Sequence, residues 1–276
     1  MSLSPEDLAY IGGLVRERSA IVLNDTKAYL VESRLTPLVR AAGLIDLHQL
    51  VRKLQQTPRS PLHDQVVEAM TTNETSFFRD IHPFEALKRD VVPALIEKRK
   101  AVRTLSIWCA AASSGQEPYS IAMSIADGFP ELAGWKVRIV ATDLATSVLE
   151  RAKQGRYSQL EVNRGLPAAM LSKHFERDGT DWRVSAKLRS MIEFRPLNLI
   201  APWPAFPSLD IVFIRNVMIY FDLPTKRDIL RRTAKLMHSD GVLFLGSAET
   251  TLNVAVEFER VQSGKASWYK LKERSS

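Results

Sequence analysis

TLSIWCAAASSGQEPYSIAM, residues Thr104–Met123, is the stretch that decides the fold. Its first six residues, 104–109, are mostly apolar and have strand character, whereas Ala110–Gly115 is a run of small residues. Glu117 and Pro118 then suit the first turn of a helix, so the order is strand, tight turn, helix. This order is typical of a crossover unit in a parallel sheet, and the small residues let the backbone approach a ligand closely.

The turn does not match a phosphate-binding loop. It carries one glycine, Gly115, whereas a dinucleotide fingerprint has three and a P-loop needs Gly-Lys-Ser/Thr. Glu117 would repel a phosphate from the helix N-terminus but could pair with a cation or accept from hydroxyls. A positively charged ligand without phosphate therefore fits better. Close packing of the backbone would also explain the small residues without any ligand.

The next apolar run, WKVRIVA at Trp135–Ala141, ends in Thr142-Asp143. Asp143 falls where doubly wound proteins place the acidic residue that binds ribose hydroxyls. The alternative is that Asp143 caps a helix over Leu144–Lys153, which is a common use of aspartate. The two roles are compatible.

Composition restricts the classes of protein. With 276 residues, 45% of them hydrophobic, the chain can bury a large core and is expected to form two domains. The sequence has no apolar run of about 18 residues and no leader, which predicts a cytoplasmic protein without membrane insertion. Cys109 is the single cysteine, and its place at the end of a strand favours a buried hydrophobe over a nucleophile. The five histidines are scattered, so no metal site is expected.

The formal net charge of +7 allows an acidic partner. No Lys/Arg tract with interleaved aromatic residues is present, so no nucleic-acid groove is expected. Between Arg34 and Ser60, Asp46 is the one acidic residue, against the basic residues Arg34, Arg40, Arg52, Lys53 and Arg59. This segment could dock on an acidic surface; the alternative is an ordinary solvated helix face.

The character of the chain changes near residue 72. Before that point, apolar residues at three- and four-residue spacing predict four helices: Leu3–Ala20, Lys27–Ala41, Leu47–Leu54 and Pro61–Met70. The breaks between them are expected at Asn24-Asp25, Gly43 and Thr57-Pro58. The first part of the chain is therefore predicted to be a small helical domain.

After about residue 101, strands are predicted to alternate with helices, which indicates a mostly parallel sheet. The predicted strands are Thr104–Cys109, Lys136–Ala141, Met191–Pro196, Leu209–Ile214 and Gly241–Leu245. A terminal hairpin, Glu257–Gln262 with Ser267–Leu271, would add antiparallel strands, which methyltransferase sheets have and nicotinamide-binding sheets lack. A second hairpin is predicted over Phe175–Val184, with Asp178-Gly179 in its turn.

Four blocks of this sequence resemble the CheR family, the S-adenosylmethionine-dependent methyltransferases of bacterial chemotaxis receptors. The blocks are NETSFFRD at Asn73–Asp80, WCAAASSGQEPYSIAM at Trp108–Met123, ATDLATSVLERA at Ala141–Ala152 and RNVMIYFD at Arg215–Asp222. The resemblance covers nearly the whole chain. It implies an α/β fold, with a Rossmann-like S-adenosylmethionine-dependent methyltransferase domain that bears a small antiparallel β-subdomain and follows a small all-α N-terminal domain.

The resemblance also implies domain limits and roles for individual residues. The limits are a helical receptor-docking domain over 1–72, a linker and cofactor lid over 73–100, and the methyltransferase domain over 101–276 with its β-subdomain near 174–190. Arg79 and Tyr220 would position the acceptor for catalysis, although each has an ordinary alternative, as a solvated arginine and a half-buried aromatic. The implied cofactor contacts are Asn73, Thr75, Arg79, Glu117, Asp143, Asn198, Leu199, Arg215 and Asn216.

The activity that the resemblance implies is methyl transfer to glutamate side chains, which yields glutamyl methyl esters and S-adenosylhomocysteine. The partner would be the cytoplasmic helical bundle of a chemoreceptor, docked through Arg34 and Arg40, and the enzyme is expected to be a monomer. Some family members bind a pentapeptide tether of the receptor through the β-subdomain. The turn Asp178-Gly179-Thr180-Asp181 is short, so tether-independent action is predicted.

Three other functions remain open at this point. The first is a methyltransferase acting on RNA or a small molecule; an RNA enzyme should show a continuous basic face and cofactor turnover stimulated by RNA. A nicotinamide dehydrogenase should bind NAD, against which the single-glycine turn argues. A non-catalytic adaptor that only binds the cofactor should have lost cofactor residues, yet all the matched positions are filled.

Overall fold

The structure is a computed structural model that describes residues 3–23, 28–57 and 59–272. Its chain divides into two compact units, one of residues 1–72 with 220–225 and the other of residues 73–219 with 226–276. The predicted break at Asn24-Asp25, the predicted helix start at Lys27, and Pro58 lie outside the described residues. Among the described helices, none combines the length and the apolar character needed to cross a membrane.

The smaller unit contains four helices: α1 (Pro5–Ser19), α2 (Ala28–Ala41), α3 (Leu47–Gln56) and α4 (Pro61–Met70). They confirm the predicted all-α N-terminal region, with ends that differ from the prediction by at most two residues. Ser4 caps α1 by accepting the Asp7 amide at 3.1 Å, and Asp46 caps α3 by accepting the Gln49 amide at 2.9 Å. The apolar faces form one core that includes the fully buried Ile11, Val31, Leu35 and Leu50.

The larger unit is built on a seven-stranded sheet with the order β6-β2-β1-β7-β8-β10-β9. The first five strands pair in parallel, and β10 and β9 are antiparallel to their neighbours. This confirms the predicted parallel sheet and terminal hairpin. The strands are β1 (Thr104–Ala110), β2 (Lys136–Asp143), β6 (Ile192–Pro196), β7 (Leu209–Ile214), β8 (Met237–Leu245), β9 (Phe258–Ser263) and β10 (Ala266–Leu271).

The parallel arrangement brings the carboxyl ends of β1, β2 and β7 to one edge of the sheet. All six residues of β7 are buried, as expected for a strand covered on both faces. The crossover helices and short turns that follow the strands of this sheet are α7 (Gln116–Gly128), η3 (Pro130–Leu132), α8 (Thr146–Gln154), η4 (Met218–Tyr220) and α12 (Leu223–Leu236), of which residues 220–225 belong to the smaller unit. Loops at such an edge are where doubly wound sheets bind their ligands.

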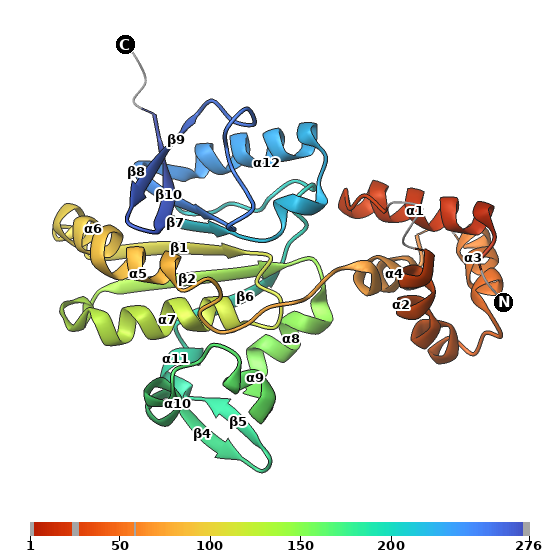
Figure 1. Cartoon of the computed structure of the whole chain (residues 1–276), viewed down its shortest axis with the longest axis horizontal. Helices are drawn as coiled ribbons and strands as arrows, with labels where there is room; N and C mark the ends of the chain where they lie inside the picture. Colours follow the sequence, from red (N-terminus) through yellow and green to blue (C-terminus); the bar gives the residue numbers. More distant parts are fainter. Residues whose placement is uncertain (1–2, 24–27, 58, 273–276) are drawn as a thin grey trace. The chain divides into compact units, whose positions relative to one another are not determined.

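A second, small sheet has the order β3-β5-β4 and is separate from the large one (Figure 1). Its strands β4 (Phe175–Asp178) and β5 (Asp181–Val184) confirm the predicted hairpin, with Gly179 at φ +65° in the turn. The third strand, β3 (Arg156–Tyr157), was not predicted, because two residues carry no periodicity. Three short helices accompany this sheet: α9 (Gln159–Asn163), α10 (Ala168–His174) and α11 (Ala186–Arg189).

The segment between the two predicted domains divides into an irregular part and a helical part. Residues 73–81 form no helix or strand, whereas 82–99 are helical, as α5 (His82–Ala86), the π-helical η2 (Leu87–Val91) and α6 (Val92–Arg99). The helical part packs into the core of the larger unit through buried apolar side chains, including Phe84, Leu87, Val92 and Leu95. Only residues 73–81 therefore have the irregular character of a linker.

The irregular segment is held against the turn between α9 and α10 at Gly165. This glycine has φ +90°, and a Cβ built on it would lie 2.1 Å from the carbonyl oxygen of Phe77. Gly165→Ala must therefore displace the segment, and we expect it to lower the free energy of unfolding by at least about 2 kcal/mol in urea titrations. The control is Gly179→Ala, which also has a positive φ but meets no atom within 4 Å. Equal losses in the two variants would contradict the contact.

Candidate functional site

The turn after β1 is held by hydrogen bonds to the end of β2. The Ala112 amide donates to the Thr142 carbonyl at 2.9 Å, and the Ser113 amide donates to Asp143 Oδ2 at 2.8 Å. Gly115 is needed for packing, because a Cβ on it would lie 2.9 Å from the Ala152 Cβ and from the Tyr157 hydroxyl. Close packing, the alternative left open by the sequence, thus accounts for Gly115, while the bonds to Asp143 connect the turn to a predicted ligand-binding residue.

Asp143 is a buried carboxylate at the end of β2. Its Oδ1 accepts the Ala145 amide at 2.9 Å, in addition to the bond from Ser113. The helix α8 begins at Thr146 with Ala145 in the cap position, two residues later than the sequence predicted, so Asp143 precedes the cap and accepts the amide of the cap residue. An ionised carboxylate has about four lone-pair sites, which suits it to accept hydrogen bonds from hydroxyl groups.

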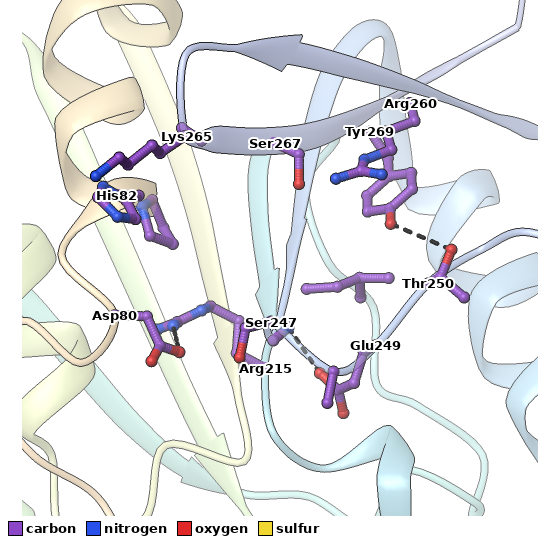
Figure 2. A pocket seen from close by; sticks show the side chains of 15 residues that line it. Asp80, His82, Arg215, Ser247, Glu249, Thr250, Arg260, Lys265, Ser267 and Tyr269 are labelled. Carbon is purple, nitrogen blue, oxygen red and sulfur yellow. Dashed lines mark hydrogen bonds and ion pairs between the residues drawn. The ribbon is translucent and has the colours of Figure 1, made fainter.

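Arg215, the residue after β7, is a buried clamp. Its side chain is 1% exposed, and its guanidinium pairs with Glu117 Oε2 at 2.5 Å and with Asp80 Oδ2 at 2.9 Å. The pair with Asp80 is drawn in Figure 2. It also donates to the Arg79 carbonyl at 3.0 Å. A buried cation needs such partners, because removing one would leave an uncompensated charge. Arg215 therefore joins the end of β7, the first turn of α7 and the irregular segment.

Cys109 is linked to this clamp through Glu117, because its thiol donates a hydrogen bond to Glu117 Oε1 at 3.2 Å. Burial raises the pKa of the Cys109 thiol well above its usual range, and the neighbouring Glu117 carboxylate raises it further. The thiol therefore stays protonated and acts as a hydrogen-bond donor, not as a nucleophile. Within the described ranges, no three His, Cys, Asp or Glu side chains gather as a metal site would require.

Asn216 and the segment 197–199 lie at the same edge. Asn216 has φ +59°, and its amide donates to Glu249 Oε2 at 2.8 Å. The Leu197 amide donates to the Asp143 carbonyl at 2.9 Å, which places Asn198 and Leu199 beside β2. The Asn198 Oδ1 atom accepts the Ile200 amide at 3.1 Å.

Backbone strain concentrates at this edge. Nine residues other than glycine have positive φ among those described, and five of them belong to the site: Phe78, Asp80, Ala111, Ser113 and Asn216. Each such residue costs of the order of 1–3 kcal/mol and persists where the surroundings over-determine it. The concentration of strain supports a binding or catalytic role for this edge.

The structure thus joins most of the predicted cofactor residues through short contacts. Ser113 Oγ donates to the Asn73 carbonyl at 2.9 Å, which ties the irregular segment to the β1 turn. Asn73 and Thr75 also line a cavity of about 610 Å³ with Ser114 and Gln116. Asp143 and Asn198 do not line that cavity.

Three predicted residues lie outside this group. Tyr220 ends η4, is half-buried and belongs by compactness to the helical unit. Arg40, on α2, is exposed, whereas Arg34 is half-buried and donates to the carbonyls of Met70 and Thr71 at 2.7 and 3.0 Å. Arg34 therefore fastens α2 to the end of α4.

Two functional candidates were missed by sequence reasoning. Asp80 ends a block that was recognised, so an acidic residue beside Arg79 was a usable signal. Glu249 accepts the amides of Gly246 at 2.7 Å and Asn216 at 2.8 Å. It was missed because its link to the site is through Asn216, which lies 33 positions away in another loop.

Comparison with known proteins identifies the family. Residues 73–267 match the model described as CheR methyltransferase, SAM binding domain, and residues 6–71 match CheR methyltransferase, all-alpha domain. The chain belongs to the CheR methyltransferase family. This confirms the resemblance carried by the four motif blocks.

Several curated CheR relatives match along nearly their whole length. Chemotaxis protein methyltransferase 1 of Pseudomonas aeruginosa is 43% identical over 279 residues, covering 99% of this chain and 100% of that protein. Chemotaxis protein methyltransferase Cher2 of Pseudomonas putida is 41% identical, covering 99% and 100%. The chemotaxis protein methyltransferase of Escherichia coli K12 is 38% identical, covering 90% and 86%.

The CheR chain described here is thus an S-adenosylmethionine-dependent methyltransferase, and its carboxyl edge fits that cofactor. S-adenosylmethionine offers ribose hydroxyls and positive charge. The edge offers Asp143 as a hydrogen-bond acceptor for hydroxyl groups and the acidic Glu117 as a partner for positive charge. It also offers the side-chain amide of Asn198. The individual cofactor contacts stay predictions.

Asp143 gives the sharpest test of that fit. Asp143→Asn leaves one carbonyl oxygen where two carboxylate oxygens now accept amides, and it removes the charge available to ribose hydroxyls. We expect the Kd for S-adenosylhomocysteine, measured by isothermal titration calorimetry, to rise at least about tenfold. Asp181→Asn, at the start of β5 in the small separate sheet, is the matched control and should bind as the wild type does. Unchanged affinity in Asp143→Asn would remove this residue from the site.

Proposed function

We propose that this enzyme methylates glutamate side chains on the cytoplasmic helices of a chemoreceptor, forming glutamyl methyl esters in chemotaxis adaptation. The observation that carries the proposal is the convergence of four motif blocks on one sheet edge, through the bonds of Asp143, Ser113 and Arg215. The chemotaxis names of relatives that match along the full chain support the same substrate. Such a substrate implies that the enzyme works in the cytoplasm.

We infer that Asp143 accepts from the ribose hydroxyls of the cofactor, and that Glu117 faces its positively charged part. Asn198 and Leu199 would contact the adenine, with Asn73, Thr75, Arg79, Arg215 and Asn216 completing the site. S-adenosylmethionine supplies an electrophilic methyl group on a sulfonium. Because Arg215 already pairs with Glu117 and Asp80, its main contribution is to hold Glu117 in place.

The acceptor needs no general base. A glutamate with a reference pKa of about 4.3 is ionised at neutral pH, so its oxygen can attack once it is positioned and partly dehydrated. The protonated Cys109 thiol, which only donates to Glu117, agrees with such base-free chemistry. Exclusion of water from the site would speed a step in which an anion and a cation neutralise each other.

Arg79 and Tyr220 are the proposed positioning groups for the acceptor carboxylate. Arg79 is half-buried and donates one hydrogen bond, to the Glu74 carbonyl at 2.9 Å. Its guanidinium makes no ion pair in the part of the chain that the structure describes, so donors remain for a carboxylate. The proposal for Tyr220 rests on its motif block alone.

We further infer that the functional domains follow the boundaries expected from sequence, with the lid restricted to residues 73–81. The helices α5 and α6 contribute core residues such as Phe84 and Leu95, so they cannot move as a lid without breaking that core. Residues 73–81 carry two strained positions, Phe78 and Asp80, and fewer regular hydrogen bonds.

Receptor docking is assigned to the helical domain, with Arg40 as the exposed contact. Arg34 is less available, since its guanidinium already donates to three groups at the end of α4. The β4–β5 turn is short, which supports action without a pentapeptide tether.

The test uses tritium-methyl S-adenosylmethionine and membranes that contain the chemoreceptors of the same organism. Label on receptor-sized protein should leave as volatile methanol under mild base, because a carboxyl methyl ester hydrolyses there. At saturating S-adenosylmethionine, Arg79→Ala and Tyr220→Phe should both transfer label about a hundredfold more slowly, as expected for a misplaced acceptor. Base-stable label would indicate a nitrogen acceptor, and no label despite cofactor binding would favour the adaptor.

Docking through Arg40 gives a second prediction. Arg40→Glu should raise the KM for receptor about three- to tenfold at low salt, and the difference should shrink at high salt as the charges are screened. Arg183→Glu, an equal charge change on the exposed face of β5, is the control and should leave the KM unchanged. Equal effects of the two variants would show that only overall charge matters.

A further inference from the structure

A second cavity, of about 360 Å³, opens beyond Arg215 at the carboxyl edge of the large sheet. Figure 2 shows the β9–β10 hairpin along one side of it, with Lys265, Arg260, Ser267 and Tyr269. Across the cavity are Asp80, before α5, and Glu249, in the loop after β8. The cavity lies wholly within the larger unit and shares Arg215 and Asp80 with the candidate site.

The acidic side chains that line this cavity have partners within the protein, whereas two of its basic side chains do not. Asp80 pairs with Arg215 at 2.9 Å, and Glu249 accepts the amides of Gly246 and Asn216. Arg260 and Lys265 are exposed, and their side chains make no hydrogen bond or ion pair among residues 3–23, 28–57 and 59–272. The hairpin wall therefore presents two uncompensated positive charges, whereas the carboxylates opposite are already engaged.

Arg215 adds an independent sign of a missing partner. Its side chain is 1% exposed and lines the cavity, yet its Nε atom has no hydrogen-bond partner in the described part of the chain. A buried N–H group without an acceptor is unfavourable, so an acceptor oxygen at this end of the cavity would be stabilising. The unpaired side chains of Arg260 and Lys265, together with the unpartnered Nε–H group of Arg215, indicate a site for an anion.

We propose that this cavity binds a second carboxylate of the protein substrate, close to the glutamate that is methylated. The inference rests on the proposed function. A carboxylate fits better than a phosphate, because a dianion would face Asp80 and Glu249, whereas a monoanion meets less repulsion and gains charge-assisted bonds from Arg260 and Lys265. Ser267 and Tyr269 offer hydroxyl groups on the same wall.

The protein substrate is the favoured source of this carboxylate, because the cavity and the methyl-transfer site share the Arg215–Asp80 pair. On a helix, side chains three or four residues apart lie on one face. An acidic residue one turn from the acceptor could therefore enter the cavity while the acceptor reaches the cofactor. Arg260 and Lys265 would then select which glutamate of a helix is presented, by fixing its register.

The test measures binding of a fluorescein-labelled peptide that carries the methylated glutamate, by fluorescence anisotropy with S-adenosylhomocysteine present. A second peptide has glutamine in place of each acidic residue within one turn of the acceptor. Arg260→Gln/Lys265→Gln should raise the Kd of the acidic peptide about tenfold and leave that of the glutamine peptide unchanged, since the lost contacts are charge-assisted. Unchanged affinity for S-adenosylhomocysteine would show that the variant is folded.

The control is Lys270→Gln/Lys272→Gln, which removes two positive charges from exposed positions that do not line the cavity. It should bind both peptides as the wild type does. An equal loss in the control, or an equal weakening of both peptides, or no change in the cavity variant, would overturn the proposal. Another result would also overturn the proposal: glutarate binds the wild-type cavity, and the glutamine peptide binds as well as the acidic peptide. The cavity would then bind a free small-molecule carboxylate and not a carboxylate of the protein substrate.

Failure of this inference can be told from failure of the proposed function. If the wild type places no base-labile methyl on the receptor, the proposed function itself is wrong. If the wild type does so but peptide binding ignores Arg260 and Lys265, only the second carboxylate site is wrong.

Discussion

The buried charge of Arg215 is the constraint on which the rest of the site depends. A guanidinium that is 1% exposed must be compensated within the protein, and here Glu117, Asp80 and the Arg79 carbonyl do so. Breaking a pair of this kind by removing one partner typically costs about 3–5 kcal/mol. Because Arg215 follows β7, Glu117 lies at the start of α7, and Arg79 and Asp80 lie in the irregular segment, the charge fixes these three segments against one another. The candidate cofactor site and the second cavity both include Arg215, so this clamp forms part of each.

The strained backbone positions lie in the segments that the Arg215 clamp holds and in the β1 turn beside it. Five strained residues surround the clamp and the β1 turn, and such conformations persist only where neighbouring contacts outweigh their cost. The bonds from Ser113 to Asp143 and to Asn73 provide part of that support at the β1 turn. A rigid edge suits methyl transfer to a carboxylate, because the acceptor is ionised beforehand and the enzyme gains rate by positioning and by exclusion of water.

The sequence predicted the elements well because they depend on local patterns. The runs 104–109 and 209–214 are apolar because their strands are buried on both faces, and Gly179 and Gly264 mark the two hairpin turns. Family motifs supplied the candidate site, but not how its residues bond. Arg34 was predicted to dock a partner, yet it fastens α2 to Met70, a contact across 36 positions. The cavity beside Arg260 and Lys265 was invisible for the same reason, since long-range packing brings its walls together.

The central claim is that the Arg215 clamp orders an edge that binds the cofactor through Asp143 and Glu117. A crystal structure of the enzyme with S-adenosylhomocysteine tests it most directly. The account predicts ribose hydroxyls on the Asp143 carboxylate, with the pairs of Arg215 to Glu117 and to Asp80 both intact. S-adenosylhomocysteine bound away from Asp143, or an Arg215 released from Glu117 and Asp80, would contradict it.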